Sequence, residues 1–171
     1  LVAEEELNPD DISALKSQIV SALDELILEF CTSRRTDGRE LEKVLKDQLT
    51  DLERLLRAAI DLLPDREKHQ ADSLKSQLKA ILKDTGQADP QRIAQELAVL
   101  AIRSDVTEEL DRLKVHVASA RNMLSIGGVI GRKMDFLMQE FNREANTLCS
   151  KSQNADLTAI GLEIKVLIDQ M

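Results

Sequence analysis

A row of apolar residues at helical spacing between residues 45 and 63 constrains the fold most strongly. The row consists of Leu45, Leu49, Leu52, Leu56, Ala59 and Leu63, with successive steps of 4, 3, 4, 3 and 4 residues. Steps that alternate between three and four keep the side chains on one face of a helix, as in a coiled-coil seam. Such a seam needs a partner helix, and the partner can belong to the same chain or to another subunit.

The composition predicts that the rest of the chain is helical as well. The 171 residues include only six Gly, three Pro and three Phe, with no Trp or Tyr. Few helix breakers and few strand-favouring aromatics are typical of a helical protein. We predict an all-α fold of extended helical hairpins and a bundle with coiled-coil-like packing. A helical-hairpin region is expected over residues 1–94, a second helical domain over residues 95–171, and a loop near residues 86–90.

The first predicted helix begins at Asn8, where Asn can cap and Pro9 fits the first helical position. Its apolar residues again recur at helical spacing: Ile12, Leu15, Ile19, Leu23, Leu26 and Phe30. The Asp37-Gly38 step is either the start of a second helix or a kink in one long helix. Both readings remain compatible with the sequence.

Composition also limits the function classes. Without Trp or Tyr, the chain lacks the aromatic stacking platform of many RNA-binding sheets. The net charge of −8 argues against a simple basic surface for nucleic acid, but residues 103–151 hold eight bases and seven acids. A phosphate would therefore be bound by Arg and Lys of this stretch. Cys31 and Cys149 have no metal-ligand spacing and are expected to be buried or half-buried free thiols in a reducing cytoplasm.

A helix predicted over residues 105–124 has a polar edge next to its apolar stripe. Asp105, Glu109, Arg112 and His116 fall within about 60° of each other at 100° per residue. Carboxylates and an imidazole on one edge could hold a divalent ion such as Mg²⁺ or Mn²⁺. The same residue types could equally form a ladder of salt bridges on the helix surface.

The next predicted helix, over residues 130–148, has an unusual polar side. It carries Asp135, Gln139, Asn142 and Asn146 in one column, flanked by Glu140, Arg143 and Thr147. Because Asn competes with the helix backbone for hydrogen bonds, an ordinary solvated face would carry Lys and Glu instead. The column therefore indicates either a polar subunit interface or a functional site.

The turn between these two helices is rich in glycine and is followed by bases. Gly127, Gly128 and Gly131 precede Arg132 and Lys133. The GKS or GKT ending of a nucleotide-binding loop is missing, and no strand precedes the turn. We expect Arg132 and Lys133 to contact an RNA backbone.

Three segments carry a family resemblance: EELDRLKVHV at 108–117, GRKMDFLMQEFNREANTLCSKS at 131–152 and LEIKVLIDQM at 162–171. They resemble the C-terminal signature of the bacterial YicC/YloC family, with small departures at Met134, Cys149 and Asp169. The resemblance implies a cytoplasmic, stress-related endoribonuclease that cleaves RNA with a divalent metal, often Mn²⁺. It also implies a homo-oligomer, a hexamer that closes over RNA, and partners in RNA decay. The family's N-terminal domain and short C-terminal tail have no counterpart here, so we expect a piece of a longer protein.

We assign the site from helix geometry rather than from the resemblance. The predicted metal ligands are Glu109, His116, Asp135 and Glu140, while Arg112 and Arg143 would neutralise charge that develops on the phosphate. RNA would be held by Arg132, Lys133, Asn142, Asn146 and Lys151. The alternative functions are a non-catalytic RNA-binding or adaptor protein and a purely structural assembly domain.

Overall fold

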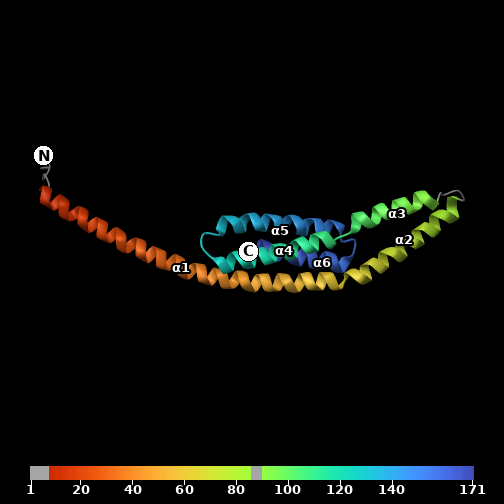
Figure 1. Cartoon of the computed structure of the whole chain (residues 1–171), viewed down its shortest axis with the longest axis horizontal. Coiled ribbons are helices and arrows are strands. Elements are labelled where there is room, and N and C mark those ends of the chain that lie inside the picture. The colour runs from red at the N-terminus through yellow and green to blue at the C-terminus, as the bar shows by residue number, and fades with distance from the viewer. Residues whose placement is uncertain (1–7, 86–89) are drawn as a thin grey trace, which may run out of the picture. The chain divides into compact units, whose positions relative to one another are not determined.

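The computed structural model describes residues 8–85 and 90–171, and every regular element in these ranges is an α-helix. The predicted all-α class is therefore confirmed. The predicted loop near residues 86–90 falls almost wholly outside the described residues. The helices are α1 (Pro9–Asp61), α2 (Leu63–Thr85), α3 (Pro90–Ser104), α4 (Thr107–Ile126), α5 (Gly131–Lys151) and α6 (Ala155–Asp169) (Figure 1).

The chain divides into two compact units, and the division falls inside α1 between Val44 and Leu45. The described part of the first unit is one helix that continues through Asp37 and Gly38. The interpretation of one long helix is therefore the correct one. The apolar row of this unit is exposed along its whole length, at Ile12, Leu15, Ile19, Leu23, Leu26 and Phe30.

The second unit is built around a four-helix bundle, formed by the part of α1 after residue 45 together with α4, α5 and α6. The heptad row supplies Leu49, Leu52, Leu56 and Ala59 to its core, each at most 2% exposed. These side chains join a single cluster with buried residues of the other three helices. The partner of the predicted seam is therefore found in the same chain.

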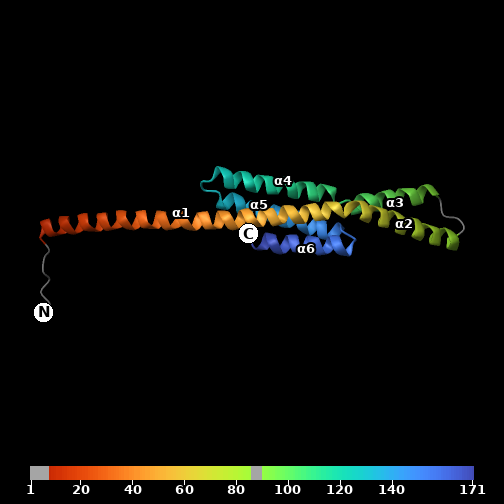
Figure 2. The ribbon, with the colours of Figure 1, turned by 90° about the horizontal axis from the view of Figure 1, so that it is seen from below.

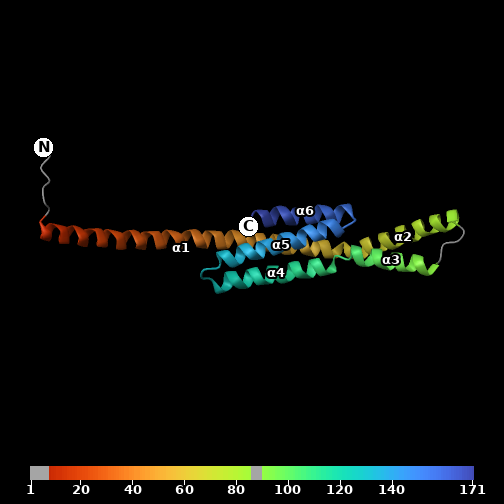
Figure 3. The same ribbon diagram turned by 90° about the horizontal axis from the view of Figure 1, so that it is seen from above.

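Helix α5 lies between α4 and α6, which occupy its opposite sides (Figures 2 and 3). Phe141, Ala145 and Leu148 of α5 are fully buried in the core. Beyond the bundle, α2 leads away from the end of α1 and α3 returns toward the start of α4 (Figure 1). The arrangement places the α5–α6 turn next to the base of this helical hairpin.

The turns owe their geometry to particular residues. Gly127 and Gly128 adopt φ angles of 71° and 84°, which L side chains rarely adopt, and this reverses the chain between α4 and α5. Asn154 caps α6, because its side-chain oxygen accepts a hydrogen bond of 2.9 Å from the Leu157 backbone N–H. These two turns set the antiparallel order of α4, α5 and α6.

A buried arginine joins the hairpin to the bundle. The guanidinium of Arg66, on α2, donates to the backbone oxygens of Ser104 and Ser152, and also to that of Lys151 at 3.0 Å. These carbonyls end α3 and α5, where the helix dipoles favour a positive charge. Burial lowers the pKa of Arg66, and the charges of Glu67 and Asp105 partly offset that effect.

None of the described helices is long and apolar enough to cross a membrane. Both cysteines are free thiols, and Cys149 is half-buried as expected. Cys31 is exposed instead, because it belongs to the part of α1 that has no helix packed on it within its own unit.

Helices α5 and α6 approach closely at Gly161, where an added Cβ would lie 2.6 Å from Sγ of Cys149. We predict that Gly161→Ala destabilises the fold by about 1 kcal/mol or more, because overpacking outweighs the better helix propensity of Ala. In a Cys149→Ala background the same change should stabilise by up to about 1 kcal/mol. Urea unfolding of the four proteins of this cycle measures the coupling. Equal effects of Gly161→Ala in both backgrounds would contradict the contact.

Candidate metal centre

The candidate site lies on the polar edge where α4 packs against α5. Both helices place apolar residues in the shared core, including Leu113 and Val117 of α4 and Phe141 of α5. Immediately beside this core, α4 presents His116 and α5 presents Glu140 and Glu144. The chain reversal at Gly127 and Gly128 brings these residues together, since they lie at similar distances along the chain from the turn.

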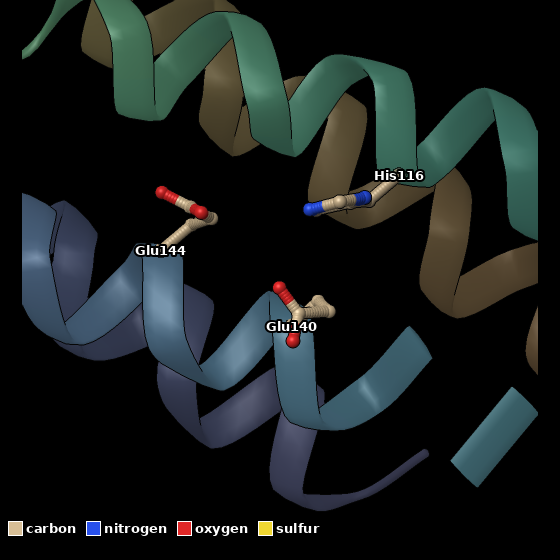
Figure 4. A group of neighbouring side chains, drawn as sticks. All are labelled: His116, Glu140 and Glu144. Atoms are coloured by element: carbon tan, nitrogen blue, oxygen red, sulfur yellow. The ribbon is translucent and has the colours of Figure 1, made fainter. Parts of the chain in front are cut away.

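His116, Glu140 and Glu144 form a group that we call the metal-ligand cluster. One potential ligand atom from each residue lies within 4.8 Å of the others. The imidazole comes from α4 and points toward the gap between the two carboxylates of α5 (Figure 4). Glu144 is buried, His116 is half-buried and Glu140 is exposed, so one side of the cluster remains accessible to solvent.

The environment of His116 supports a ligand role. Its ring lies edge-on to the buried ring of Phe141, with centroids 5.5 Å apart and planes at 67°. Its Nε2 atom is buried and has no hydrogen-bond partner in the described chain. A buried ring nitrogen without a partner is costly, so an ion or ordered water would complete it. One imidazole and two carboxylates fit a divalent cation such as Mn²⁺ and leave coordination positions open.

Glu144 is the member that the sequence analysis missed. It is only 4% exposed and sits among the core residues of α5, where a carboxylate is unusual without a partner. Its spacing of four residues from Glu140 places both carboxylates on one face of the helix. That spacing, beside the apolar stripe, was a signal in the sequence that could have identified it.

Arg112 lies one turn before His116 and links the two helices. Its Nη1 donates to Oε1 of Glu144 at 3.1 Å, and its Nη2 donates to Oε1 of Glu108 at 2.5 Å. The hydrogen bond to Glu144 is the main cause of a raised pKa of Arg112, and the charge of Glu108 adds to it. Part of the predicted edge is thus an ion-pair network, and this network orients one carboxylate of the metal-ligand cluster.

Glu109 does not join His116, contrary to the predicted grouping. Seven residues separate them on α4, about 10 Å along the helix axis. Buried Glu109 instead accepts a hydrogen bond of 2.7 Å from Lys151. That bond is the main cause of the raised pKa of Lys151, which is a structural partner of Glu109 rather than a free contact for RNA.

Asp135 is likewise not brought to the cluster. It is exposed, and five residues of α5 put it about 140° around the helix from Glu140. Arg143 and Asn146 are exposed on α5, whereas Asn142 is half-buried and donates to Asp169 of α6 at 3.4 Å. The predicted polar column therefore lies partly against α6 and apart from His116.

The predicted RNA-contacting bases lie at opposite ends of α5. Arg132 and Lys133 are exposed in its first turn, and Lys151 is its last residue. About 27 Å of helix separates Lys133 from Lys151. These side chains could contact one extended strand at two points, but they do not form one compact basic patch.

A groove of about 530 Å³ runs along the exposed side of α4 beside the cluster. It is lined by Asp105, Thr107, Glu108, Asp111, Arg112, Val115 and His116. His116 and Arg112 are thus reachable from solvent through this groove. At its far end Asp105 accepts a hydrogen bond of 2.9 Å from the Thr107 backbone N–H, which holds the first turn of α4.

Comparison with known proteins places this arrangement in a family. The sequence profile of the family described as Endoribonuclease YicC-like, C-terminal, matches residues 60–171. This range contains α4, α5 and α6, and all three members of the metal-ligand cluster. The chain belongs to this family.

Two curated relatives extend the similarity to nearly the whole chain. The chain is 39% identical over 178 aligned residues to the probable endoribonuclease YicC of Haemophilus influenzae, covering 97% of this chain and 57% of that protein. It is 30% identical over 169 residues to the probable endoribonuclease YicC of Clostridioides difficile, covering 95% and 55%. The chain therefore spans little more than half the length of these relatives.

The hydrogen bond that Asp105 accepts should make the stability of the fold depend on pH. It is the main cause of a lowered Asp105 pKa, so the stabilisation is present above the usual carboxyl pKa and is lost as pH falls through the lowered value. We expect Asp105→Ala to cost about 1 kcal/mol at pH 7, the usual contribution of one hydrogen bond. The cost should shrink as pH falls below the usual carboxyl pKa and through the lowered pKa of Asp105. Urea unfolding of both proteins at each pH measures it, and an unchanged difference would contradict the assignment.

Proposed function

We propose that this chain takes part in metal-dependent hydrolysis of RNA phosphodiester bonds, with the cation held by His116, Glu140 and Glu144. The observation that carries the proposal is that a ring nitrogen of His116 lies within 4.8 Å of two carboxylate oxygens, while the buried Nε2 of the same ring has no hydrogen-bond partner in the described chain. Family membership and the names of the two relatives support RNA as the substrate. Mn²⁺ and Mg²⁺ are the cations that this donor set favours.

The residues around the cluster have complementary roles in this proposal. A divalent ion, when bound, supplies positive charge at a phosphate and lowers the pKa of a water molecule. Arg112 holds Glu144 in place through its Nη1 donor and lies in the groove, where it partly offsets the charge of the carboxylates that a phosphate would meet. Phe141 fixes the orientation of the His116 ring from the apolar side.

The exposed bases of α5 would hold the RNA backbone on either side of the cut. Arg132, Lys133 and Arg143 are exposed and lie on the same helix as Glu140. Each would add a phosphate contact that weakens as salt rises. We also propose action in the cytoplasm with RNA-decay proteins as partners, as the family resemblance implies.

Cleavage of a fluorescent RNA by the highly purified chain tests the activity. We expect cleavage with Mn²⁺, and none with EDTA, because removing the cation removes the charge that activates water. Activity that persists in EDTA, or that disappears on further purification, would favour a non-catalytic RNA-binding adaptor instead. Anomalous X-ray density for Mn²⁺ soaked into crystals would locate the cation independently of activity.

Calorimetric titration with Mn²⁺ tests the ligand set. His116→Ala and Glu140→Gln should each lower Mn²⁺ affinity at least about tenfold, since each removes a ligand. Asp135→Asn is the matched control, because it neutralises an exposed carboxylate on another face of the same helix. The ligand set predicted from sequence requires an equal loss in Asp135→Asn. Such a loss, or unchanged affinity in His116→Ala, would contradict the proposed centre.

We further propose that the chain acts as a homo-oligomer, with a hexamer expected from the family. The exposed apolar row of the first unit supports this, because a contiguous apolar stripe is typical of an association surface. Leu23→Glu with Leu26→Glu should lower the molar mass measured by light scattering. Ser17→Glu with Ser21→Glu adds the same charge on the opposite face of the helix and should leave the mass unchanged. Equal masses for all three proteins would contradict this role of the row.

A further inference from the structure

A second and larger cavity, which we call the hairpin cavity, has no part in the site described above. It has a volume of about 860 Å³ and lies between α2, the end of α3, the start of α4 and the α5–α6 turn. This size is within the range of pockets that enclose a small organic group. Amide side chains of Gln70, Gln77, Gln153 and Asn154 line it, and Leu74 and Val106 supply apolar surface.

The charges of the hairpin cavity disfavour a phosphate. Arg66 borders the cavity, but its donors are directed to the backbone oxygens of Ser104, Lys151 and Ser152. Glu67 and Asp105 contribute carboxylates to the lining. His69 is the remaining ionisable residue of the described lining, and Arg66 is already engaged with carbonyls, so the two carboxylates make an uncharged group a better fit than an anion.

The amides indicate what kind of uncharged group fits. Each side-chain amide offers both a donor and an acceptor, and Gln and Asn pair in this way with the edges of nucleobases. Gln70 Nε2 donates to Gln153 Oε1 at 3.3 Å, a long bond that an incoming partner can replace. A planar heterocycle with several donors and acceptors matches this lining and its apolar wall.

Gln153 holds a strained conformation at the mouth of the cavity. Its φ angle is 45°, the one positive value for a non-glycine residue among the described residues. Such a backbone is costly for a side chain other than Gly and is common at ligand-binding positions. In this chain the strain directs a glutamine from the α5–α6 turn toward Gln70 of α2.

The hairpin cavity and the groove beside the metal-ligand cluster are neighbours on the molecule. Asp105 and Thr107 line both cavities. Nine residues of α4 separate Thr107 from His116, which is about 14 Å along the helix. A few nucleotides of an extended strand cover this distance, so one RNA strand can reach both places.

From these observations we propose that the hairpin cavity binds one unpaired nucleobase of the RNA strand, a few nucleotides from the phosphate at the metal-ligand cluster. The inference rests on the proposed function, because the RNA strand that supplies the base is the strand bound at the metal-ligand cluster. A base in a duplex has its pairing edge engaged and cannot enter the cavity. The cavity would therefore select single-stranded positions in the substrate.

Binding of a fluorescent single-stranded RNA, measured by anisotropy in EDTA, tests the proposal without cleavage. A series of otherwise identical RNAs would each lack the base at one position. We expect one position at which base removal weakens binding about tenfold, the effect of one or two hydrogen bonds with some apolar burial. In Gln70→Leu, removal of that base should no longer change the affinity for the RNA. The matched control Gln95→Leu changes an exposed glutamine on α3 outside the cavity and should behave as the parent chain.

A second variant gives a steric test at an exposed position, where the fold does not depend on the size of the side chain. Ala71→Trp places a large side chain in the lining and should abolish the response to base removal. A response that persists in both Gln70→Leu and Ala71→Trp, or its absence in the parent chain, would overturn the base site. Because cleavage with Mn²⁺ is assayed separately, loss of the base site with intact cleavage leaves the proposed function standing. Base recognition without cleavage would overturn only the hydrolase assignment.

Discussion

The antiparallel contact between α4 and α5 is the interaction on which the rest of the site depends. Its apolar side buries Leu113 and Val117 against Phe141 and its neighbours, and this burial fixes the register of the two helices. Once the register is fixed, it determines which polar side chains of the two helices meet. His116 meets Glu140 and Glu144, Arg112 meets Glu144, and Glu109 meets Lys151.

Some buried polar groups along this edge form ion pairs that stabilise the fold, and others could bind a ligand. Glu109 and Lys151 neutralise one another, and such a pair tolerates loss of one partner poorly. Oε2 of Glu109 and Nε2 of His116 are both buried without a partner in the described chain, but Glu109 has a cation on its other oxygen, whereas His116 faces the carboxylates of Glu140 and Glu144. Within one helix pair, then, one ion pair holds the elements together and a neighbouring group remains available for a ligand. This contrast is the physical basis for separating the metal-ligand cluster from the ion pairs around it.

Arg66 couples the hairpin to the bundle and thereby shapes the second cavity. By donating to the carbonyls that end α3 and α5, it satisfies acceptors that would otherwise be buried without partners. The same contacts engage Arg66, the one arginine in the described lining of the cavity. Both cavities carry carboxylates, so only the proposed cation would make the groove beside α4 the more favourable place for a phosphate, whereas amides and apolar groups line much of the hairpin cavity. A phosphate and a base of one strand would separate between them for this reason.

The sequence by itself determined the all-α class, the helix positions, the buried faces and the family, because helical periodicity and signature residues are local properties. It also marked His116 and Glu140 as candidate ligands, since unusual residue types beside an apolar stripe are visible in one helix. Which carboxylates surround His116 was decided by the tertiary structure alone, because that depends on the register between α4 and α5. On α5, Asp135 lies closer to the α4–α5 turn than the position that faces His116. On α4, Glu109 lies about two helical turns farther from that turn than His116. Glu144 was overlooked because it stands among the core residues of α5. The hairpin cavity could not be predicted from the sequence, because its lining comes from α2, the α3–α4 junction and the α5–α6 turn, which are distant along the chain.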